Sequence, residues 1–309
     1  MSQTHSSSWQ RVLLPLIALG AMAASYAVFF LQRDTVYALG REDGLFEDLT
    51  AVFFFCASAT FACAFWRSGA NANDNTNTNG GAAASGGANA NDNANTNGGA
   101  GASDASAAPR RRRNVWFLLL ALLFFFGGGE EISWGQRIFG WDTPQAFEQA
   151  NIQRETNIHN LKIFNRSDAN WNGKTGAAEF LSAERMFSLF WLGFCLATPI
   201  AYACVPPLRR LLDRLRMPIV PLPLGVMFLV NYASGEILKP HALRLTLEWP
   251  LMEIKECLFS VLFLLIASYF LTRQARTRRA ATPAIIAKPP VTARPTSAAA
   301  DEELAHVAV

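Results

Sequence analysis

The stretch GGGEEISWGQRIFGWDTP, residues 127–144, decides how the chain is organised. It follows VWFLLLALLFFF, residues 115–126, a run apolar enough to begin a helix in lipid. A helix that continues through this run places two adjacent carboxylates, Glu130 and Glu131, within the membrane. Charged groups at that depth are costly, and they pair or line functional cavities. The stretch therefore predicts a membrane helix with a polar site near one face.

The composition of the whole chain favours a membrane protein. Of 309 residues, 51% are hydrophobic and 12% are aromatic, which is too apolar for an ordinary soluble domain. About 20 apolar residues are needed to cross a bilayer core of roughly 30 Å. Six stretches qualify, at residues 12–31, 49–66, 114–133, 186–204, 219–236 and 251–271. The predicted fold class is all-α, a polytopic bundle of six transmembrane helices.

The arginines predict how the chain is oriented in the membrane. They cluster at three places: before the third apolar stretch, between the fourth and the fifth, and after the sixth. The clusters are Arg110 to Arg113, then Arg209, Arg210, Arg214 and Arg216, and finally Arg273, Arg276, Arg278 and Arg279. Because Lys and Arg accumulate in cytoplasmic loops, we expect both termini in the cytoplasm and three loops outside. The expected location is the inner (plasma) membrane. We interpret these clusters as topology signals and not as nucleic-acid-binding patches.

The chain divides into four regions. Residues 1–67 hold the first two spans, 68–113 form a linker, 114–279 form a four-span domain with an outer loop at 134–183, and 280–309 form a tail. The linker is rich in Asn, Gly and Ala, and its residues 69–82 recur almost unchanged at 87–100. Such sequence buries too little apolar area to offset its ordering entropy, so we expect the linker and the tail to be disordered.

Polar residues of separate spans fall at one depth. Glu130 lies 17 residues after Arg113, and Glu256 lies 17 residues before Arg273. At about 1.5 Å per residue, both are roughly 25 Å from the inner face of the membrane. Other polar residues expected near this level are Asn231, Glu236 and Glu253. The recurrence favours a polar cavity just under the outer surface.

The third span predicts a polar helix face. If the helix continues without interruption, Glu130, Trp134 and Arg137 share one side, at i, i+4 and i+7. The three glycines before Glu130 remove side-chain bulk, so another helix, a lipid or a ligand can approach closely. The alternative to a functional cavity is structural pairing of the glutamates with nearby cations, namely Arg137, Lys239 or Arg244.

A pair of acids also opens the second span. Glu47 and Asp48 stand at its outer end, where carboxylates favour a helix N-terminus through the helix macrodipole. The other interpretation is that these acids join the polar site of the third span.

The outer loop carries candidate metal ligands. Threonine and proline at residues 143–144 are typical of a helix start, and they predict a helix over residues 145–164. Glu155 and His159 then lie at i, i+4, a spacing that can place a carboxylate and an imidazole on one metal. His241 is the other histidine on that side. No HExxH motif is present and a solvated Glu/His pair is the simpler alternative, so metal and cofactor stay unknown.

Two neighbouring motifs resemble a known family. EEISWGQRIFGWDTP followed by NIQRETNIHNL is similar to a motif pair in a bacterial family of multi-pass membrane proteins of uncharacterised function. The resemblance covers residues 127–165 and the general arrangement of the spans. The resemblance implies no reaction, cofactor or catalytic residue for this chain. The Asn-rich linker departs from the family pattern, and we interpret it as an insertion.

These features favour a membrane-embedded enzyme that acts on a lipid or lipid-linked substrate at the outer leaflet, with membrane lipids as its partners. The candidate catalytic residues, which would serve as general base, metal ligand or proton shuttle, are Glu130, Glu131, Arg137, His159 and Glu256. The candidate substrate-binding residues are Trp134, Gln136, Asn157, Asn160, Asn231, Glu236, His241 and Glu253. The alternatives are a transporter or ion-coupled carrier and a non-enzymatic assembly factor. Protein partners are not indicated.

Overall fold

The chain is helical wherever its structure is described. The computed structural model describes residues 8–40, 44–69, 113–165 and 175–281. Within these ranges the one pairing of extended backbone is an antiparallel bridge between Asn151 and Leu161. The predicted all-α class is confirmed. Most of the predicted linker, at 70–112, and nearly all of the tail, at 282–309, lie outside the described residues.

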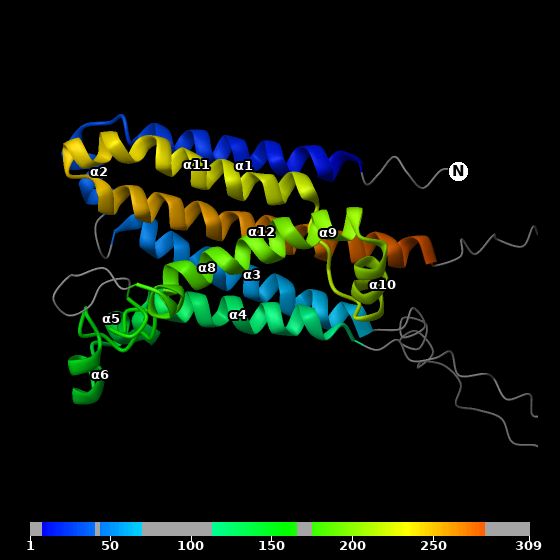
Figure 1. Ribbon diagram of the computed structural model, residues 1–309, viewed down its shortest axis with the longest axis horizontal. Helices are drawn as coiled ribbons and strands as arrows, with labels where there is room; N and C mark the ends of the chain where they lie inside the picture. The colour runs from blue at the N-terminus through cyan, green and yellow to red at the C-terminus, as the bar shows by residue number, and fades with distance from the viewer. Residues whose placement is uncertain (1–7, 41–43, 70–112, 166–174, 282–309) are drawn as a thin grey trace, which may run out of the picture.

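Each of the six apolar stretches forms a helix or a run of helices, and these lie alongside one another (Figure 1). They are α1 (Ser8–Val28), α3 (Leu45–Gly69), α4 (Val115–Glu131), the run of α8 (Ala183–Trp191), η3 (Leu192–Ala197) and α9 (Thr198–Cys204), α11 (Leu222–Leu245) and α12 (Glu248–Ala281). The short helix α7 (Ala177–Phe180) precedes α8.

Not all of these helices have the length and apolarity of a membrane span. Three segments of the described chain do, namely Arg33–Gly69, Ala183–Cys204 and Glu248–Arg276. A fourth is obtained if α4 and the segment Ser133–Phe139, bent by 67° at a break, count as one span. The apolar helix Val12–Val28 is shorter, and α11 carries Asn231, Glu236 and Lys239. The structure thus supports three or four membrane-length helices, compared with six predicted.

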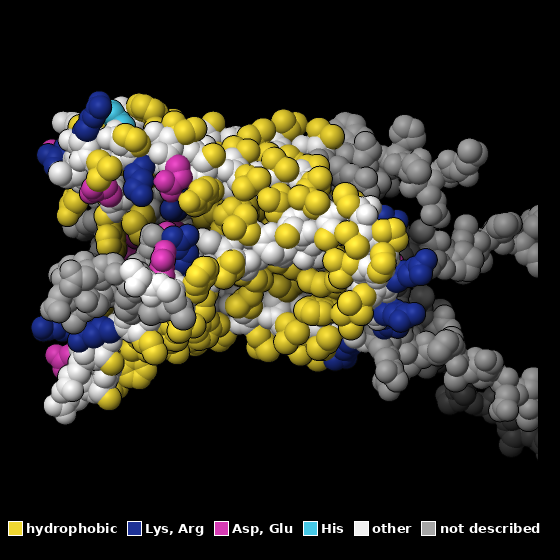
Figure 2. Space-filling view, viewed as in Figure 1, with side chains coloured by type: hydrophobic (Ala, Val, Ile, Leu, Met, Phe, Trp, Pro, Cys, Tyr) yellow, Lys and Arg dark blue, Asp and Glu magenta, His cyan; other side chains and the backbone are white. Residues whose placement is uncertain are grey.

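The bundle has two unlike ends. The short helices α2 (Arg33–Gly40), α5 (Gln136–Phe139) and α6 (Gln145–Ala150) lie at one end, which we call the loop end (Figure 1). At the other end lie α10 (Pro206–Arg214), the start of α1 and the last turns of α12, and we call it the arginine end. Figure 2 shows a broad hydrophobic surface between them, with Lys and Arg side chains at both ends and Asp and Glu side chains at the loop end. This pattern suits a bundle surrounded by lipid.

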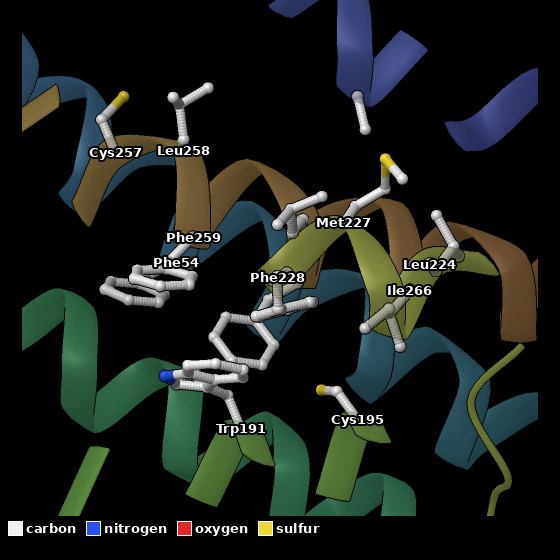
Figure 3. Close-up of a cluster of buried hydrophobic side chains, with 14 of the residues drawn as sticks. Phe54, Trp191, Cys195, Leu224, Met227, Phe228, Cys257, Leu258, Phe259 and Ile266 are labelled. Carbon is white, nitrogen blue, oxygen red and sulfur yellow. The ribbon is translucent and has the colours of Figure 1, made fainter. Parts of the chain in front are cut away.

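Aromatic side chains fill the centre of the bundle (Figure 3). Helix α12 packs against α1, α3 and α11. The fully buried ring of its Phe263 lies 4.6 Å from the ring centroid of Phe124 in α4 and 4.8 Å from that of Phe228 in α11. Trp191 of α8 stacks on Phe228 at 5.9 Å. Each such pair contributes roughly 0.5–1.5 kcal/mol beyond its buried area, so α12 and its aromatic neighbours form the core.

One close contact between helices requires a glycine. The segment η3 is a π-helix, in which the backbone N–H and the hydroxyl of Thr198 both bond to the Gly193 carbonyl. The Cys195 carbonyl of this segment faces α11, where a Cβ on Gly225 would lie 2.0 Å from the carbonyl oxygen. Because the opposing atom belongs to the backbone, it cannot move aside by changing rotamer, and only glycine fits.

We expect Gly225→Ala to lower the melting temperature of the purified protein, since overpacking of a close contact costs about 2 kcal/mol. Gly20→Ala in α1 is the matched control, because a Cβ there meets nothing within 4 Å and alanine favours a helix. Thermal unfolding in detergent, followed by circular dichroism, measures both variants. Equal melting temperatures would contradict the close approach of α11 to η3.

Candidate functional site

Helix α4 ends in a sharp turn directly after its two glutamates. The residues of η2 (Ser133–Gly135) have positive φ values of 47°, 56° and 85°. This left-handed conformation costs roughly 1–2 kcal/mol for a residue with a side chain, so the surrounding contacts must hold it. The prediction that Glu130, Trp134 and Arg137 share one helical face was wrong, because the helix stops at Glu131.

The glycine run leaves room for Trp134 and for helix α3. A Cβ on Gly129 would lie 2.9 Å from the Trp134 indole, and a Cβ on Gly128 would lie 3.0 Å from the ring of Phe55. The predicted close approach at these glycines is confirmed. Trp134 Nε1 donates a hydrogen bond to Glu130 Oε1 at 2.5 Å, so the indole folds back onto the end of α4.

The segment after α6 is a compact loop, and the helix predicted over residues 145–164 was wrong beyond α6. Asn151 Nδ2 donates to the backbone oxygen and to the side-chain oxygen of Asn157, each at 2.7 Å. Asn151 Oδ1 accepts the backbone N–H of Gln153 at 2.8 Å. Such side-chain bonds offer the backbone an alternative to the helical hydrogen-bond ladder, which explains why the helix ends here.

Glu130 ties this loop to the end of α4. Its Oε2 accepts the backbone N–H groups of Ile158 at 2.6 Å and of His159 at 2.7 Å, and it lies 3.2 Å from His159 Nδ1. The Glu130 side chain is only 5% exposed. Charge-assisted bonds of this kind are short and strong. From this position, Glu130 orients the His159 ring.

Arg137 joins the loop to helix α3. Its Nε and Nη2 donate to the two carboxylate oxygens of Glu155, each at 3.0 Å, and its Nη1 donates to Glu47 at 2.5 Å. Asn157 Nδ2 also donates to Glu155, at 3.0 Å. Burial alone would lower the pKa of Arg137, but the bonds and charges of Glu155 and Glu47 raise it above its usual value. Both interpretations of Glu47 are confirmed, because it lies in the first turn of α3 and also contacts Arg137.

A group of carboxylates lies next to this network, and we call it the acid cluster. Helices α3, α4, α8 and α12 contribute its members, which are Glu47, Glu131, Glu184, Glu253 and Glu256. The charge of Glu256 acts on Glu131, and the charge of His159 acts on Glu256. The predicted residues Glu131, Glu253 and Glu256 thus interact electrostatically, and Glu256 also interacts with His159.

Asn231 has a structural position. It is fully buried, its Oδ1 accepts the Tyr26 hydroxyl at 2.8 Å, and its Nδ2 donates to the Lys255 carbonyl at 2.9 Å. These bonds join α1, α11 and α12. A buried amide whose bonds are satisfied in this way stabilises the packing of the three helices.

The structure places two other predicted residues of α11 in different surroundings. Glu236 lies 4.0 Å from Lys239, and both side chains are exposed. His241 packs near the rings of Phe29 and Phe30, with centroids 6.2 and 6.3 Å away. His159 instead lies against Glu130, so the two histidines do not share their neighbours.

The predicted residues Gln136 and Asn160 stabilise the loop itself. Gln136 Oε1 accepts the backbone N–H of Thr156 at 2.9 Å. Asn160 Nδ2 donates to the side-chain oxygen of Gln153. Both amides therefore hold the loop in the shape that presents His159.

The structure brings no metal-binding set together in the part of the chain that it describes. No group there of three or more His, Cys, Asp or Glu side chains could hold a metal ion. The pair predicted from helical spacing is separated, because Glu155 faces Arg137 while His159 faces Glu130.

The sequence-based prediction missed two contributors to this end of the bundle. Ser133 is fully buried and its hydroxyl donates to Glu155. Glu184 stands in the first turn of α8 and acts on Glu256. An acid in the first turn of a membrane-length helix was a usable signal for Glu184, as it was for Glu47. No sequence pattern indicated the role of Ser133, because that role follows from the left-handed turn.

No protein-family model matches the chain, and neither does any curated protein or solved structure. The resemblance of residues 127–165 to a bacterial family is therefore a proposal. One fold can serve many functions, so function is argued below from the site.

We expect Gly129→Ala to lower the melting temperature more than Gly127→Ala. The new Cβ at residue 129 displaces the Trp134 indole from Glu130, and the loss of a bond to a charged acceptor costs about 1.5–3 kcal/mol. A Cβ on Gly127 would make an ordinary contact of 3.6 Å with Phe54. Thermal unfolding of the two purified variants measures the difference, and equal effects would contradict the position of Trp134.

We expect Arg137→Lys to destabilise the protein by about 2 kcal/mol, because one ammonium group cannot bond both oxygens of Glu155 and also reach Glu47. Arg185→Lys is the control. Arg185 pairs with Glu179 in an exposed contact, with side chains 47% and 39% exposed, and such pairs contribute less than about 1 kcal/mol. Unfolding in denaturant measures both. Equal losses would show that Arg137 does not bridge the two carboxylates.

Proposed function

We propose that all six long helical segments span the inner (plasma) membrane and that both termini are cytoplasmic. Their arrangement side by side and the hydrophobic surface around them support six spans. Because Lys and Arg accumulate on the cytoplasmic side, the arginine end faces inward. The loop end, with Glu130 and His159, then faces the outer leaflet. The motif pair at residues 127–165 supports membership of the bacterial multi-pass membrane family that it resembles.

We infer that the protein is a membrane-embedded enzyme that performs acid–base chemistry on a lipid or lipid-linked substrate at the outer leaflet. The observation that carries this inference is the 3.2 Å contact between His159 Nδ1 and Glu130 Oε2. The carboxylate is 5% exposed, while the imidazole side chain is 40% exposed. A buried carboxylate thus orients a ring that solvent or substrate can reach.

This arrangement suits His159 as a general base. When Nδ1–H donates to Glu130, the tautomer that this contact favours, Nε2 carries the lone pair that takes a proton from water or a hydroxyl group. Glu130 then stabilises the imidazolium, as buried carboxylates do in carboxylate–histidine pairs of hydrolases. Glu256, which interacts electrostatically with His159, is the candidate to return a proton to the leaving group. Arg137 is a positioning residue, because it holds the loop.

The position of the acids bears on the two alternatives. A carrier has its binding site near the middle of the membrane, whereas the acid cluster lies at the loop end. A non-enzymatic assembly factor would use Glu130 and Arg137 only to hold the loop, and both are engaged in that way. Such a factor has no use for a proton acceptor at His159 Nε2, so that atom distinguishes the enzyme from the assembly factor.

The test is a whole-cell lipid profile measured by mass spectrometry. A deletion strain is compared with strains that express wild type or His159→Asn at equal levels in the membrane. The backbone N–H of residue 159 still bonds to Glu130 in this variant, and asparagine keeps a donor near Nδ1 but takes up no proton. We expect the lipid that depends on wild type to revert to the deletion level, through a loss of about 100-fold or more in rate.

Glu148→Gln is the matched control, since Glu148 is an exposed carboxylate on α6 in the same outer region. We expect it to retain the wild-type profile. If His159→Asn also retains that profile, the enzyme is rejected and the assembly factor is favoured. If deletion changes no lipid at all, a lipid substrate is rejected.

A further inference from the structure

An open apolar groove lies between α4 and the run of α8 and η3. It has a volume of about 390 Å³, which is within the usual range for small-molecule sites. Leu119 and Leu123 of α4 line it together with Phe190 of α8 and Gly193 of η3. Because the lining is almost entirely apolar, the groove suits a hydrocarbon chain better than a polar ligand.

The groove begins at the arginine end of the bundle. Three of its lining residues lie there, namely Trp116 in the first turn of α4, Thr198 at the start of α9 and Met217 just after α10. Leu123 follows Trp116 by seven residues, which is roughly 10 Å at about 1.5 Å per residue. One leaflet of a bilayer core is about 15 Å thick. With the arginine end in the cytoplasm, as proposed above, the groove therefore lies within the cytoplasmic leaflet.

The end of α10 is held against this opening. Trp116 Nε1 donates a hydrogen bond to the backbone oxygen of Leu215 at 2.8 Å, and Leu215 directly follows Arg214. Asn114 Nδ2 donates to the backbone oxygen of Arg216, also at 2.8 Å. These two bonds join the C-terminal end of α10 to the first turn of α4, where the groove begins.

Helix α10 has the composition of an interfacial helix. Leu211 and Leu215, one turn apart, have exposed fractions of 49% and 50%. Arg210 and Arg214, also one turn apart, are exposed as well. Leucines next to arginines on an exposed helix are typical of a helix that lies in the headgroup region of a membrane. Figure 1 agrees with this, because α10 lies across the direction of the long helices.

The charge around the opening favours an anionic headgroup. Residues 186–235 contain four arginines and a single acid, Asp213, which accepts a hydrogen bond from the Tyr202 hydroxyl at 3.0 Å. In the part of the chain that the structure describes, neither Arg210 nor Arg214 takes part in a hydrogen bond or an ion pair. A guanidinium group binds phosphate through two parallel N–H groups, so these two side chains have the right chemistry to hold one.

We propose that this site binds one anionic phospholipid of the cytoplasmic leaflet, with its phosphate at Arg210 and Arg214 and one acyl chain in the groove. The site lies at the opposite end of the bundle from His159, so it is separate from the proposed chemistry. It rests only on the proposed orientation of the bundle. A lipid bound in this way joins α4, α8 and η3 through its chain and α10 through its phosphate, so its binding stabilises the folded protein.

The test compares phosphatidylglycerol, which is anionic, with phosphatidylethanolamine of the same acyl chains. Binding to the purified full-length protein in detergent is measured by native mass spectrometry and by the shift in melting temperature. We expect phosphatidylglycerol to bind wild type about tenfold more tightly, because two basic residues attract its net charge. A high salt concentration should reduce this preference, since it screens exposed charges. Equal binding of the two lipids to wild type would overturn the headgroup assignment.

The position of the phosphate is tested by Arg210→Gln and Arg214→Gln, made as separate variants. Each should reduce the preference for phosphatidylglycerol about threefold, because each removes one of the two charges. Arg244→Gln is the matched control, since Arg244 is an exposed arginine in the last turn of α11 and lies near the loop end. A preference that neither α10 variant changes would overturn the position of the phosphate.

The groove is tested by Gly193→Leu, which fills it at a position where a Cβ meets nothing within 4 Å. We expect this variant to bind both lipids about fivefold more weakly, because the acyl chain loses apolar contact area. Gly20→Leu in α1 is its control, since that position is equally open but lies outside the groove. Leu119→Trp fills the groove from α4, and Leu122→Trp is its control, because both leucines are exposed but Leu122 does not line the groove. Unchanged binding by Gly193→Leu and Leu119→Trp would overturn the position of the acyl chain.

The two proposals can fail separately. His159→Asn leaves the groove and α10 unchanged, so we expect it to bind phosphatidylglycerol as wild type does. If wild type prefers phosphatidylglycerol while the whole-cell lipid profile is insensitive to His159, the lipid site stands and the enzyme fails. If the profile depends on His159 but wild type binds the two lipids equally, the lipid site fails alone.

Discussion

The carboxylate of Glu130 is the group on which the loop end of the bundle depends. A charge buried at the end of an apolar helix is costly unless hydrogen-bond donors surround it. Here the donors come from Trp134 and from the backbone of Ile158 and His159. The dependence is mutual, because the described loop residues after α6, 151–165, are rich in amides and contain no helix that could hold them in place. One carboxylate therefore determines both where the loop lies and how the His159 ring is oriented.

Helix α4 packs differently on its two sides. Small residues let two helices approach closely, and the glycine run of α4 brings it against the aromatic rings of α3. The other side of α4 faces α8 and η3 across an open apolar groove. The π-helical segment η3 brings the Cys195 carbonyl against Gly225 of α11, while Gly193 opens toward the groove. Bulges of this kind are frequent at functional sites.

The outer loop shows which features a local sequence pattern predicts and which it does not. Threonine and proline at residues 143–144 predicted a helix start, and α6 begins at Gln145, one residue later than this pattern implies, with Pro144 at its N-cap. The predicted length was wrong, since Asn151 and Asn157 bond to each other and to the backbone and so compete with helical hydrogen bonds. The pairing of Glu155 with His159 depended on that helix and failed with it. Counting residues from the arginines placed Glu130 and Glu256 at similar distances along their helices, and in the structure His159 interacts with both of them.

The sequence by itself determined the helical class, the places of the six apolar stretches and the end of the bundle where acids and a histidine gather. These follow from local hydrophobicity and from residue spacing along straight helices. Only the tertiary structure decided which groups contact one another. The left-handed turn at Ser133–Gly135 redirects the chain after α4, so Arg137 reaches Glu47 and Glu155, and Glu130 reaches His159. Contacts between segments so far apart in the chain depend on turn geometry and helix packing, which no local pattern in the sequence specifies.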